Sequence, residues 1–395
     1  MFGCVFAVLC KHTTKHHKTS TGSVVTKNTT KGTMSENQVT LQEPVIGEES
    51  IKLIERLCNA SAVSGDEREV RQIVLEMVRP LADEVKVDAL GSVLAIKHAV
   101  GVENPVRVML DAHMDEIGFL IVSDEEGGLY RFTKIGGIDD RTLPGKIVLV
   151  GKENVPGVIG AKAIHLTEPG ETDSKISLDT MRIDIGLGGG KIKPGDRAAF
   201  ATRFREIGPS FVAKALDNRL GCALLIEILK AAPPNVELLL SWSVQEEIGL
   251  RGARVAAYTL NPDLAIAVDS TPANDMPKHD ESESYTYNTK LGQGPAIYLA
   301  DSSTLGDPRI AQMVMRTGDE LNIPYQIRQP GGGGTDAGSI HKVRAGVPAI
   351  SISVPGRYAH TAAMVSRRSD YENAVRLIWN ALRRIDRSIL DGSRN

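Results

Sequence analysis

Two adjacent carboxylates follow an apolar run and could carry out metal or acid–base chemistry. Glu246 and Glu247 come shortly after residues 236–244, a run whose composition predicts a buried strand. In open α/β sheets, functional groups gather at the carboxyl ends of the strands. One acid of such a pair could bind a metal ion while its neighbour moves a proton. Taken alone, the pair fits a solvated turn equally well.

Other acids and histidines stand at similar places along the chain. Each follows a short apolar run or begins a predicted helix: His113 and Asp115 after 106–111, Asp217 before 218–229, Asp269 after 264–268, and His360 after 349–354. Each also has a purely structural interpretation, because aspartates cap helices and turns and loop histidines often only pack. On an extended chain His113 and Asp115 project to the same side, so the acid could orient the imidazole.

A cluster of these carboxylates would need a cation. Asp217, Glu247 and Asp269 would repel one another, and would take up protons, unless a positive charge neutralised them. Three carboxylates and two imidazoles suit two divalent ions that share one carboxylate, and oxygen and nitrogen donors fit zinc, cobalt or manganese. Paired ions of this kind activate a water molecule and polarise a carbonyl group. The pattern therefore predicts a dinuclear hydrolytic centre.

The sequence lacks the motifs of several other hydrolase and nucleotide-binding classes. It contains no H-E-x-x-H, no G-x-S-x-G nucleophile elbow and no Walker P-loop. Residues 186–190 are rich in glycine but lack the G-x-G-x-x-G spacing, so they predict a turn rather than a phosphate-binding loop.

The composition limits the fold and excludes several function classes. A chain of 395 residues can hold one large core and a smaller domain. A net charge of -3 and a scarcity of aromatic residues argue against nucleic-acid binding, and no apolar stretch is long enough to span a membrane. The cysteines at 4, 10, 58 and 222 form no C-x-x-C pair. They indicate a reducing compartment, and we expect the cytoplasm.

The pattern of residues predicts three parts. Residues 1–47 form a leader, because the polar tract at 11–32 has no apolar periodicity; we expect disorder, with organellar targeting as the alternative. Residues 48–118 and 209–395 alternate helical and β-like patterns, which is typical of a layered α/β domain. Residues 119–208 hold short β-branched runs between Gly, Pro and Asp, typical of a small β-barrel or sandwich.

Helix signals occur near both ends of the α/β part. Residues 51–57 have helical spacing, Ser64 is placed to cap a second helix, and a last helix is expected over 370–389. The α/β domain is therefore predicted to begin and end with helices, and the β-rich insertion interrupts it.

In this order, the candidate residues resemble the TET-like (tetrahedral) aminopeptidases of metallopeptidase clan MH, also called glutamyl or deblocking aminopeptidases. The resemblance covers nearly everything from residue 48 onward, and the matching segments are 113–118, 217–219, 244–253, 332–338 and 354–360. The Gln-Glu-Glu and Gly-Gly-Thr-Asp-Ala segments are highly specific. The insertion lies between His113 and Asp217 as in that family, whereas related dinuclear carboxypeptidases and deacylases carry their extra domain after the Glu-Glu motif.

The resemblance implies a fold and a ligand set. The fold would be a three-layer aminopeptidase-type catalytic domain with an inserted, PDZ-like small β-barrel that drives dimerisation. Asp217 would bridge two divalent ions in each subunit. His113 and Asp269 would complete one metal site, and Glu247 and His360 would complete the other.

The resemblance also implies catalytic roles and an assembly. Glu246 would be the general base that deprotonates a metal-bridging water, and Asp115 would orient His113. Residues 331–338 would line the substrate pocket. Dimers would assemble into a hollow dodecamer that admits peptides and unfolded segments, so the expected partners are peptide substrates and copies of the same chain.

The sequence therefore predicts a dinuclear metallo-aminopeptidase that removes N-terminal residues from peptides. One alternative is a glycosidase of the endoglucanase type, because two carboxylates alone can hydrolyse a glycosidic bond without metal. Another is a scaffold that kept the fold and lost catalysis. The presence of all five implied ligands and the base argues against the scaffold.

Overall fold

The computed structural model describes residues 42–168, 170, 176–188, 190–277, 288–329 and 332–392. Most of the predicted leader, residues 1–41, lies outside this part, and so does Gly331 of the predicted pocket loop. In the described part of the chain, no helix is both long enough and apolar enough to cross a membrane.

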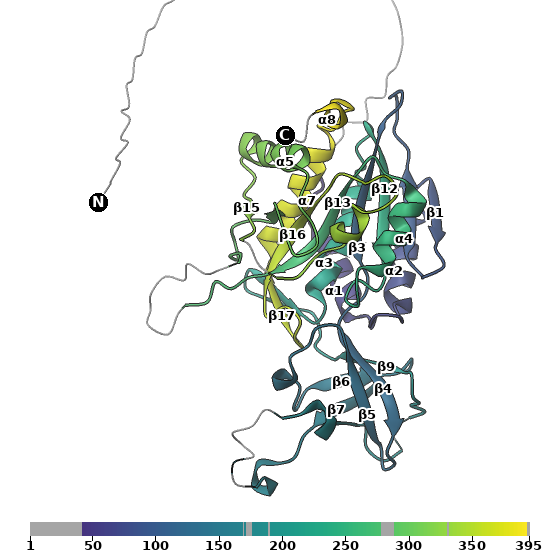
Figure 1. The fold of residues 1–395 in the computed structure, drawn as a ribbon, viewed down its shortest axis with the longest axis vertical. Helices are drawn as coiled ribbons and strands as arrows, with labels where there is room; N and C mark the ends of the chain where they lie inside the picture. Colours follow the sequence, from purple (N-terminus) through teal and green to yellow (C-terminus); the bar gives the residue numbers. More distant parts are fainter. Residues whose placement is uncertain are drawn as a thin grey trace, which may run out of the picture. The chain divides into compact units, whose positions relative to one another are not determined.

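A large mixed sheet forms the centre of the fold (Figure 1). Its strand order is β1-β2-β12-β3-β13-β16-β17-β11-β10, with β14 paired to β16 and β15 paired to β14. Strands β12, β3, β13 and β16 run parallel at its centre and are buried over nearly their whole length, which explains their continuous apolar sequences. The bounds are β1 Glu84–Val87, β2 Val93–Lys97, β3 Val106–His113, β10 Arg205–Ile207, β11 Ser210–Ala213, β12 Val236–Ser243, β13 Leu264–Pro272, β14 Ala296–Tyr298, β15 Gln326–Ile327, β16 Ala349–Arg357 and β17 Met364–Arg367.

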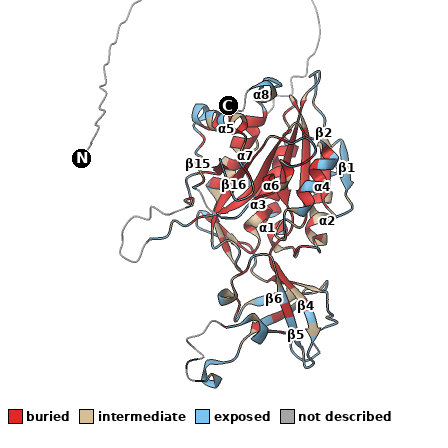
Figure 2. Ribbon diagram, in the orientation of Figure 1, coloured by how far each residue is buried: buried red, intermediate tan, exposed pale blue. Residues whose placement is uncertain are grey.

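Helices cover both faces of this sheet. Along β3, Val108 and Leu110 pack into a core with residues of α1, α2, α3, α5 and α7, whereas Met109 packs with α4 and α6 on the other face. The buried sheet between the helical layers is visible in Figure 2. This confirms the three-layer α/β fold. The helices are α1 Glu48–Asn59, α2 Arg68–Val78, α3 Leu216–Lys230, α4 Arg251–Leu260, α5 Pro308–Leu321, α6 Ala337–Ile340, α7 Arg368–Leu382 and α8 Ser388–Asp391.

The β-rich insertion forms a closed barrel in the order β4-β5-β8-β7-β6-β9. Phe119 is at its centre, with its ring 5.2 Å from those of both Phe132 and Phe200 in edge-to-face contacts. The predicted β-barrel is therefore present. The bounds are β4 Gly118–Asp124, β5 Leu129–Ile135, β6 Ile147–Val150, β7 Val155–Gly160, β8 Arg182–Asp184 and β9 Arg197–Phe200, with the 3-10 helices η1 Asp140–Thr142, η2 Ile164–Leu166 and η4 Leu178–Thr180.

Two helix predictions differ from the structure in detail. The second helix begins at Arg68, and Ser64 does not cap it; its hydroxyl donates to the carboxylate of Asp115 instead. The last predicted helix is divided, since α7 ends at Leu382 and α8 begins at Ser388. In both places a tertiary contact or a turn outweighs the local helix signal.

Residues 42–47 belonged to the predicted leader, yet they pack against the fold. Ile46 is buried, and the carboxylate of Glu43 accepts hydrogen bonds from Arg376 and Asn380 of α7. The described end of the leader is thus held to the last long helix.

A buried group of charges lies where β3 leads into the barrel. The carboxylate of Glu116 accepts hydrogen bonds from Lys214 Nζ at 2.6 Å and from Arg219 Nη2 at 3.1 Å, and all three side chains are 2% exposed or less. Lys214 also donates to the carbonyl of Ala60. The group joins the strand that ends at His113 to the segment that begins α3.

Replacing Glu116 with glutamine should destabilise the protein by about 3–5 kcal/mol, because two buried cations lose their shared counter-charge. The free energy of unfolding can be followed in urea through the fluorescence of the buried Trp242 and Trp379. Glu49→Gln is the matched control, since Glu49 pairs with Lys52 on the surface and should change stability by less than about 0.5 kcal/mol. Equal effects of the two substitutions would contradict the expected role of the buried group.

Candidate metal centre

The central parallel strands bring the predicted site residues to one edge of the sheet. His113 ends β3 and lies level with Ser243, the last residue of β12, so the loop holding Glu246 and Glu247 begins beside it. Asp269 is near the end of the next strand, β13. His360 follows β16, the neighbour of β13. The geometry predicted from strand ends is therefore the geometry observed.

Asp217 reaches the site from a distorted helix start. Ala215 has left-handed backbone angles, and neither Asp217 nor Asn218 has helical φ and ψ values. Asp217 is therefore not a regular N-terminal cap, which was its alternative interpretation. Asn218 is held by hydrogen bonds from its side-chain amide to the carbonyl of Val268 and from the Gly221 amide to its side-chain oxygen.

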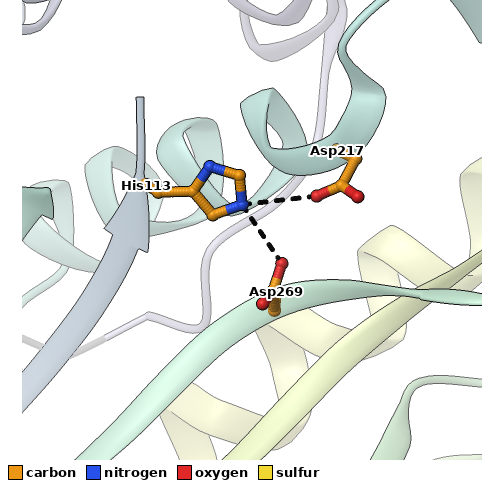
Figure 3. A group of neighbouring side chains, drawn as sticks. All are labelled: His113, Asp217 and Asp269. Carbon is orange, nitrogen blue, oxygen red and sulfur yellow. Dashed lines mark ion pairs between the residues drawn. The ribbon is translucent and has the colours of Figure 1, made fainter. Parts of the chain in front are cut away.

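The first group of candidate ligands consists of His113, Asp217 and Asp269 (Figure 3). His113 Nε2 lies 3.4 Å from Asp217 Oδ1 and 3.4 Å from Asp269 Oδ1. The other ring nitrogen, Nδ1, lies 3.1 Å from the backbone oxygen and 3.5 Å from the carboxylate of Asp115. Nδ1 therefore faces Asp115, while Nε2 faces Asp217 and Asp269.

The second group consists of Asp217, Glu247 and His360. His360 Nε2 lies 3.6 Å from Asp217 Oδ2 and 3.4 Å from Glu247 Oε2. Asp217 thus belongs to both groups, with Oδ1 facing one histidine and Oδ2 facing the other. In each group the possible ligand atoms lie within 4.8 Å of one another. This is the arrangement that a bridging carboxylate between two ions requires.

The charges in this site favour a bound cation. Burial, reinforced by the neighbouring Asp217, raises the pKa of Asp269 to about 6 and that of Glu247 to about 8, although the histidines partly oppose both shifts. Burial would lower the pKa of His113, but its contacts with Asp115, Asp217 and Asp269 outweigh this effect and raise it well above its usual range. Asp217 Oδ1 is buried and makes no hydrogen bond within the described part of the chain. Cations would keep these acids ionised and occupy that oxygen, so the donor set fits divalent metal ions.

Asp115 is fully buried and connects several parts of the site. Its carboxylate accepts hydrogen bonds from Ser64 Oγ at 2.6 Å and from the amides of Glu246 and Glu247 at 3.0 and 3.2 Å. Burial would raise the pKa of Asp115, but its contacts with His113 and Ser64 outweigh burial and lower it. Asp115 therefore stays ionised and holds the Glu-Glu backbone as well as the imidazole. The sequence predicted only the second of these roles.

A second buried carboxylate pair adjoins the site and had not been predicted. Ser243 Oγ lies 3.0 Å from Asp111 Oδ2 and 3.0 Å from Asp336 Oδ2, and all three residues are buried. The sequence offered one signal for each acid, since Asp111 is on the same side of its strand as His113 and Asp336 is in the Gly-Gly-Thr-Asp-Ala segment. The group anchors the end of β12 and the start of α6 beneath the candidate ligands.

The two ligand groups open onto a pocket of about 740 Å³. Gly332, Gly333 and Gly334 of the predicted pocket loop line it. Arg328 also lines it, a residue that the sequence had not indicated. Its guanidinium lies 4.4 Å from the centre of the Tyr298 ring and donates to the carbonyl of Gly332. The pocket is large enough for an amino-acid side chain and part of a peptide.

Comparison with known proteins gives a consistent match. A family model described as M42 glutamyl aminopeptidase matches residues 91–377. The glutamyl aminopeptidase of Lactococcus lactis subsp. cremoris is 30% identical over 340 residues, which cover 81% of this chain and 92% of the relative. The lysyl aminopeptidase of Pyrococcus furiosus is also 30% identical, over 339 residues that cover 82% and 94% of the two chains.

Solved structures show the same likeness. A TET aminopeptidase from a marine sediment archaeon, Thaumarchaeota archaeon SCGC AB-539-E09, has a TM-score of 0.80 at 34% identity, covering 87% of this chain and 99% of that one. The TET1 peptidase of Pyrococcus horikoshii, which can assemble into a tetrahedron or a large octahedral shell, has a TM-score of 0.74 at 31% identity, covering 85% and 100%. The related PhTET1-12s structure holds a dodecamer. A Thermotoga maritima protein described as an endoglucanase has a TM-score of 0.68 at 30% identity, covering 86% and 98%.

Proposed function

Because this chain belongs to the M42 glutamyl aminopeptidase family and is a metal-dependent aminopeptidase, we propose that it hydrolyses the first peptide bond of peptides at a centre with two divalent ions. The proposal of two ions rests on one observation. The two oxygens of Asp217 face different histidines, each within a separate ligand group. His113, Asp217 and Asp269 would hold the first ion. Asp217, Glu247 and His360 would hold the second. Zinc or cobalt is the proposed metal, with manganese as a further candidate.

When bound, the ions would activate a water molecule and polarise the scissile carbonyl group. Glu246 borders the pocket beside both ligand groups, and we assign it the role of general base. Burial and the neighbouring acids raise its pKa well above the usual range, although His113 opposes this shift, so nearby positive charge is needed to keep it ionised.

In the reaction, Glu246 would take a proton from the attacking water and deliver it to the nitrogen of the leaving amine. The water oxygen would first add to the carbonyl carbon, and the carbon–nitrogen bond would then break as the amine nitrogen receives the proton, which yields a free amino acid and a shortened peptide. Asp115 would hold the backbone of Glu246 during this transfer through its contact with the Glu246 amide. Asp115 therefore acts as a positioning residue for the base and for one histidine.

Chelation should abolish the aminopeptidase activity of the purified protein, and addition of Co²⁺ or Zn²⁺ should restore it. The measurement is release of a chromophore from a panel of aminoacyl anilides before and after treatment with EDTA. A carbohydrate substrate belongs in the same panel, because a two-carboxylate glycosidase needs no metal. Activity on that substrate that survives chelation, without peptidase activity, would favour the endoglucanase alternative. Metal binding without any turnover would favour the inactive scaffold.

We also propose that the chain forms dimers through its barrel and that the dimers assemble into a dodecamer. Support comes from apolar side chains on the outside of the barrel. Ile147 of β6 and Val158 of β7 are paired across the two strands and are 60% and 38% exposed, and Ile164 and Leu166 add further exposed apolar surface. The dodecamer of the PhTET1-12s structure supports this assembly, and the tetrahedron or octahedral shell of the TET1 peptidase supports self-association more generally.

The buried free thiols of Cys58 and Cys222 fit a reducing compartment, and we propose the cytoplasm.

Two relatives of equal identity are named for opposite charges of the N-terminal residue, glutamyl and lysyl. Family membership therefore does not fix the preferred residue, and the anilide panel is the means to determine it.

A further inference from the structure

A loop of the inserted barrel reaches the second ligand group. The carbonyl oxygen of Gly137, between β5 and η1, lies 2.9 Å from Nδ1 of His360. A carbonyl oxygen can only accept, so Nδ1 must carry the hydrogen. The lone pair of neutral His360 is then on Nε2, the nitrogen that faces Asp217 and Glu247. The barrel thus selects the form of the imidazole that binds a metal ion.

The barrel holds this loop firmly. Lys134, at the end of β5, donates to the carbonyl of Ile138 at 2.8 Å and to Asp140 at 2.6 Å. These bonds connect the end of β5 to the residues that follow Gly137. The Ile138 side chain is buried in the hydrophobic core of the barrel. The position of the Gly137 carbonyl therefore follows from the folding of the barrel and not from the catalytic domain alone.

Close contact continues at the neighbouring residue. Gly136 has a φ of +82°, and a Cβ placed there would lie 2.6 Å from Ile117 and 3.4 Å from Glu247 Oε2. Glycine is favoured here by the positive φ and by the close approach to Ile117, and it leaves the backbone in van der Waals reach of the Glu247 carboxylate. A Cβ on Gly137 would lie 3.3 Å from His360 Nδ1. Both glycines allow the backbone to touch the ligand residues without a side chain between them.

The barrel also contacts the support of the first ligand group. Arg197 Nε of β9 donates to the carbonyl of Ser64 at 3.1 Å, and the Ser64 hydroxyl donates to Asp115. This path ends at His113, but it passes through two more residues than the path to His360. The barrel should therefore influence the second metal site more directly than the first.

We infer that the inserted barrel is a structural part of the second metal site, and that the Gly137 carbonyl is a positioning group for His360. The inference rests on the proposed function, because it presumes that His360 binds a metal ion. If the contact were only packing between two parts of the chain, its loss would lower stability without changing one metal site selectively.

The test is a Co²⁺ titration of metal-free protein, with bound metal counted by mass spectrometry and the visible cobalt spectrum recorded. Gly137→Ala is the main variant, because its backbone is outside the left-handed region and the added methyl presses on His360. Gly160→Ala is the matched barrel control, since a Cβ there meets only the Arg182 carbonyl oxygen at 3.8 Å. His360→Ala and Asp269→Asn serve as references for loss of the second and the first site.

Gly137→Ala is expected to weaken the binding of the second Co²⁺ ion by roughly 10- to 100-fold and to leave the binding of the first unchanged. Its titration should therefore resemble that of His360→Ala and not that of Asp269→Asn. Gly160→Ala should match the wild type. Equal binding by Gly137→Ala and the wild type would overturn the inference. If the wild type bound fewer than two ions, or if His360→Ala lost none, the proposed function would fail instead. Lys134→Met, which loosens the loop without adding volume, should show the same selective loss and serves if Gly137→Ala does not fold.

Discussion

Glu246→Gln is expected to bind two metal ions normally and to lose about 100- to 10,000-fold in kcat. The amide has the shape of the carboxylate but cannot accept the proton of the attacking water. The backbone amide of Glu246 still donates to Asp115, so the loop and the adjacent Glu247 should keep their places. The loss should fall on kcat rather than on metal content.

The measurement combines anilide hydrolysis with metal counting on the same preparations. Glu84→Gln, on the exposed edge strand β1, is the matched control and should retain full activity. Turnover of Glu246→Gln close to the wild-type rate would remove Glu246 from the role of base. Loss of metal in this variant would show instead that Glu246 supports the ligands.

Asp217→Asn is expected to lose both metal ions and all measurable activity. Each of the two ligand groups would keep only one carboxylate and one histidine, because the shared Asp217 charge serves both. Asn218 and the Gly221 amide hold the local backbone independently of the Asp217 carboxylate, so the helix start should persist. The effect is therefore expected on binding rather than on folding.

Asp269→Asn gives the matched comparison, because Asp269 belongs to one group alone. Asp269→Asn should weaken the binding of one ion and leave the other bound, whereas Asp217→Asn should release both ions. Metal content after gel filtration, together with circular dichroism as a check on folding, distinguishes the two. Two ions retained by Asp217→Asn at wild-type affinity would contradict a bridging role.

Much of the site followed from local sequence. The apolar runs that precede His113, Asp269 and His360 are buried parallel strands, and parallel neighbours end at one edge of the sheet. The residues that follow them were therefore expected to meet, and they do. The β-rich insertion was also evident, because short β-branched runs between turn residues are a strong barrel signal.

Other features could not follow from local sequence, because tertiary contacts decide them. Ser64 has the sequence of a helix cap, yet its hydroxyl bonds to Asp115. Gly137 contacts His360 through its backbone carbonyl group. Every residue has such a group, so no residue type in the sequence could indicate this contact. Arg205–Ile207 fell within the predicted insertion, but β10 pairs with β11 in the large sheet.

Asp217 is proposed to join two metal ions, one held with His113 and Asp269 and the other with Glu247 and His360. X-ray diffraction from crystals grown with zinc or cobalt, recorded at the absorption edge of the metal, locates such ions directly. Two anomalous peaks are expected, one on each side of the Asp217 carboxylate. A single peak, or peaks away from Asp217, would contradict this proposal.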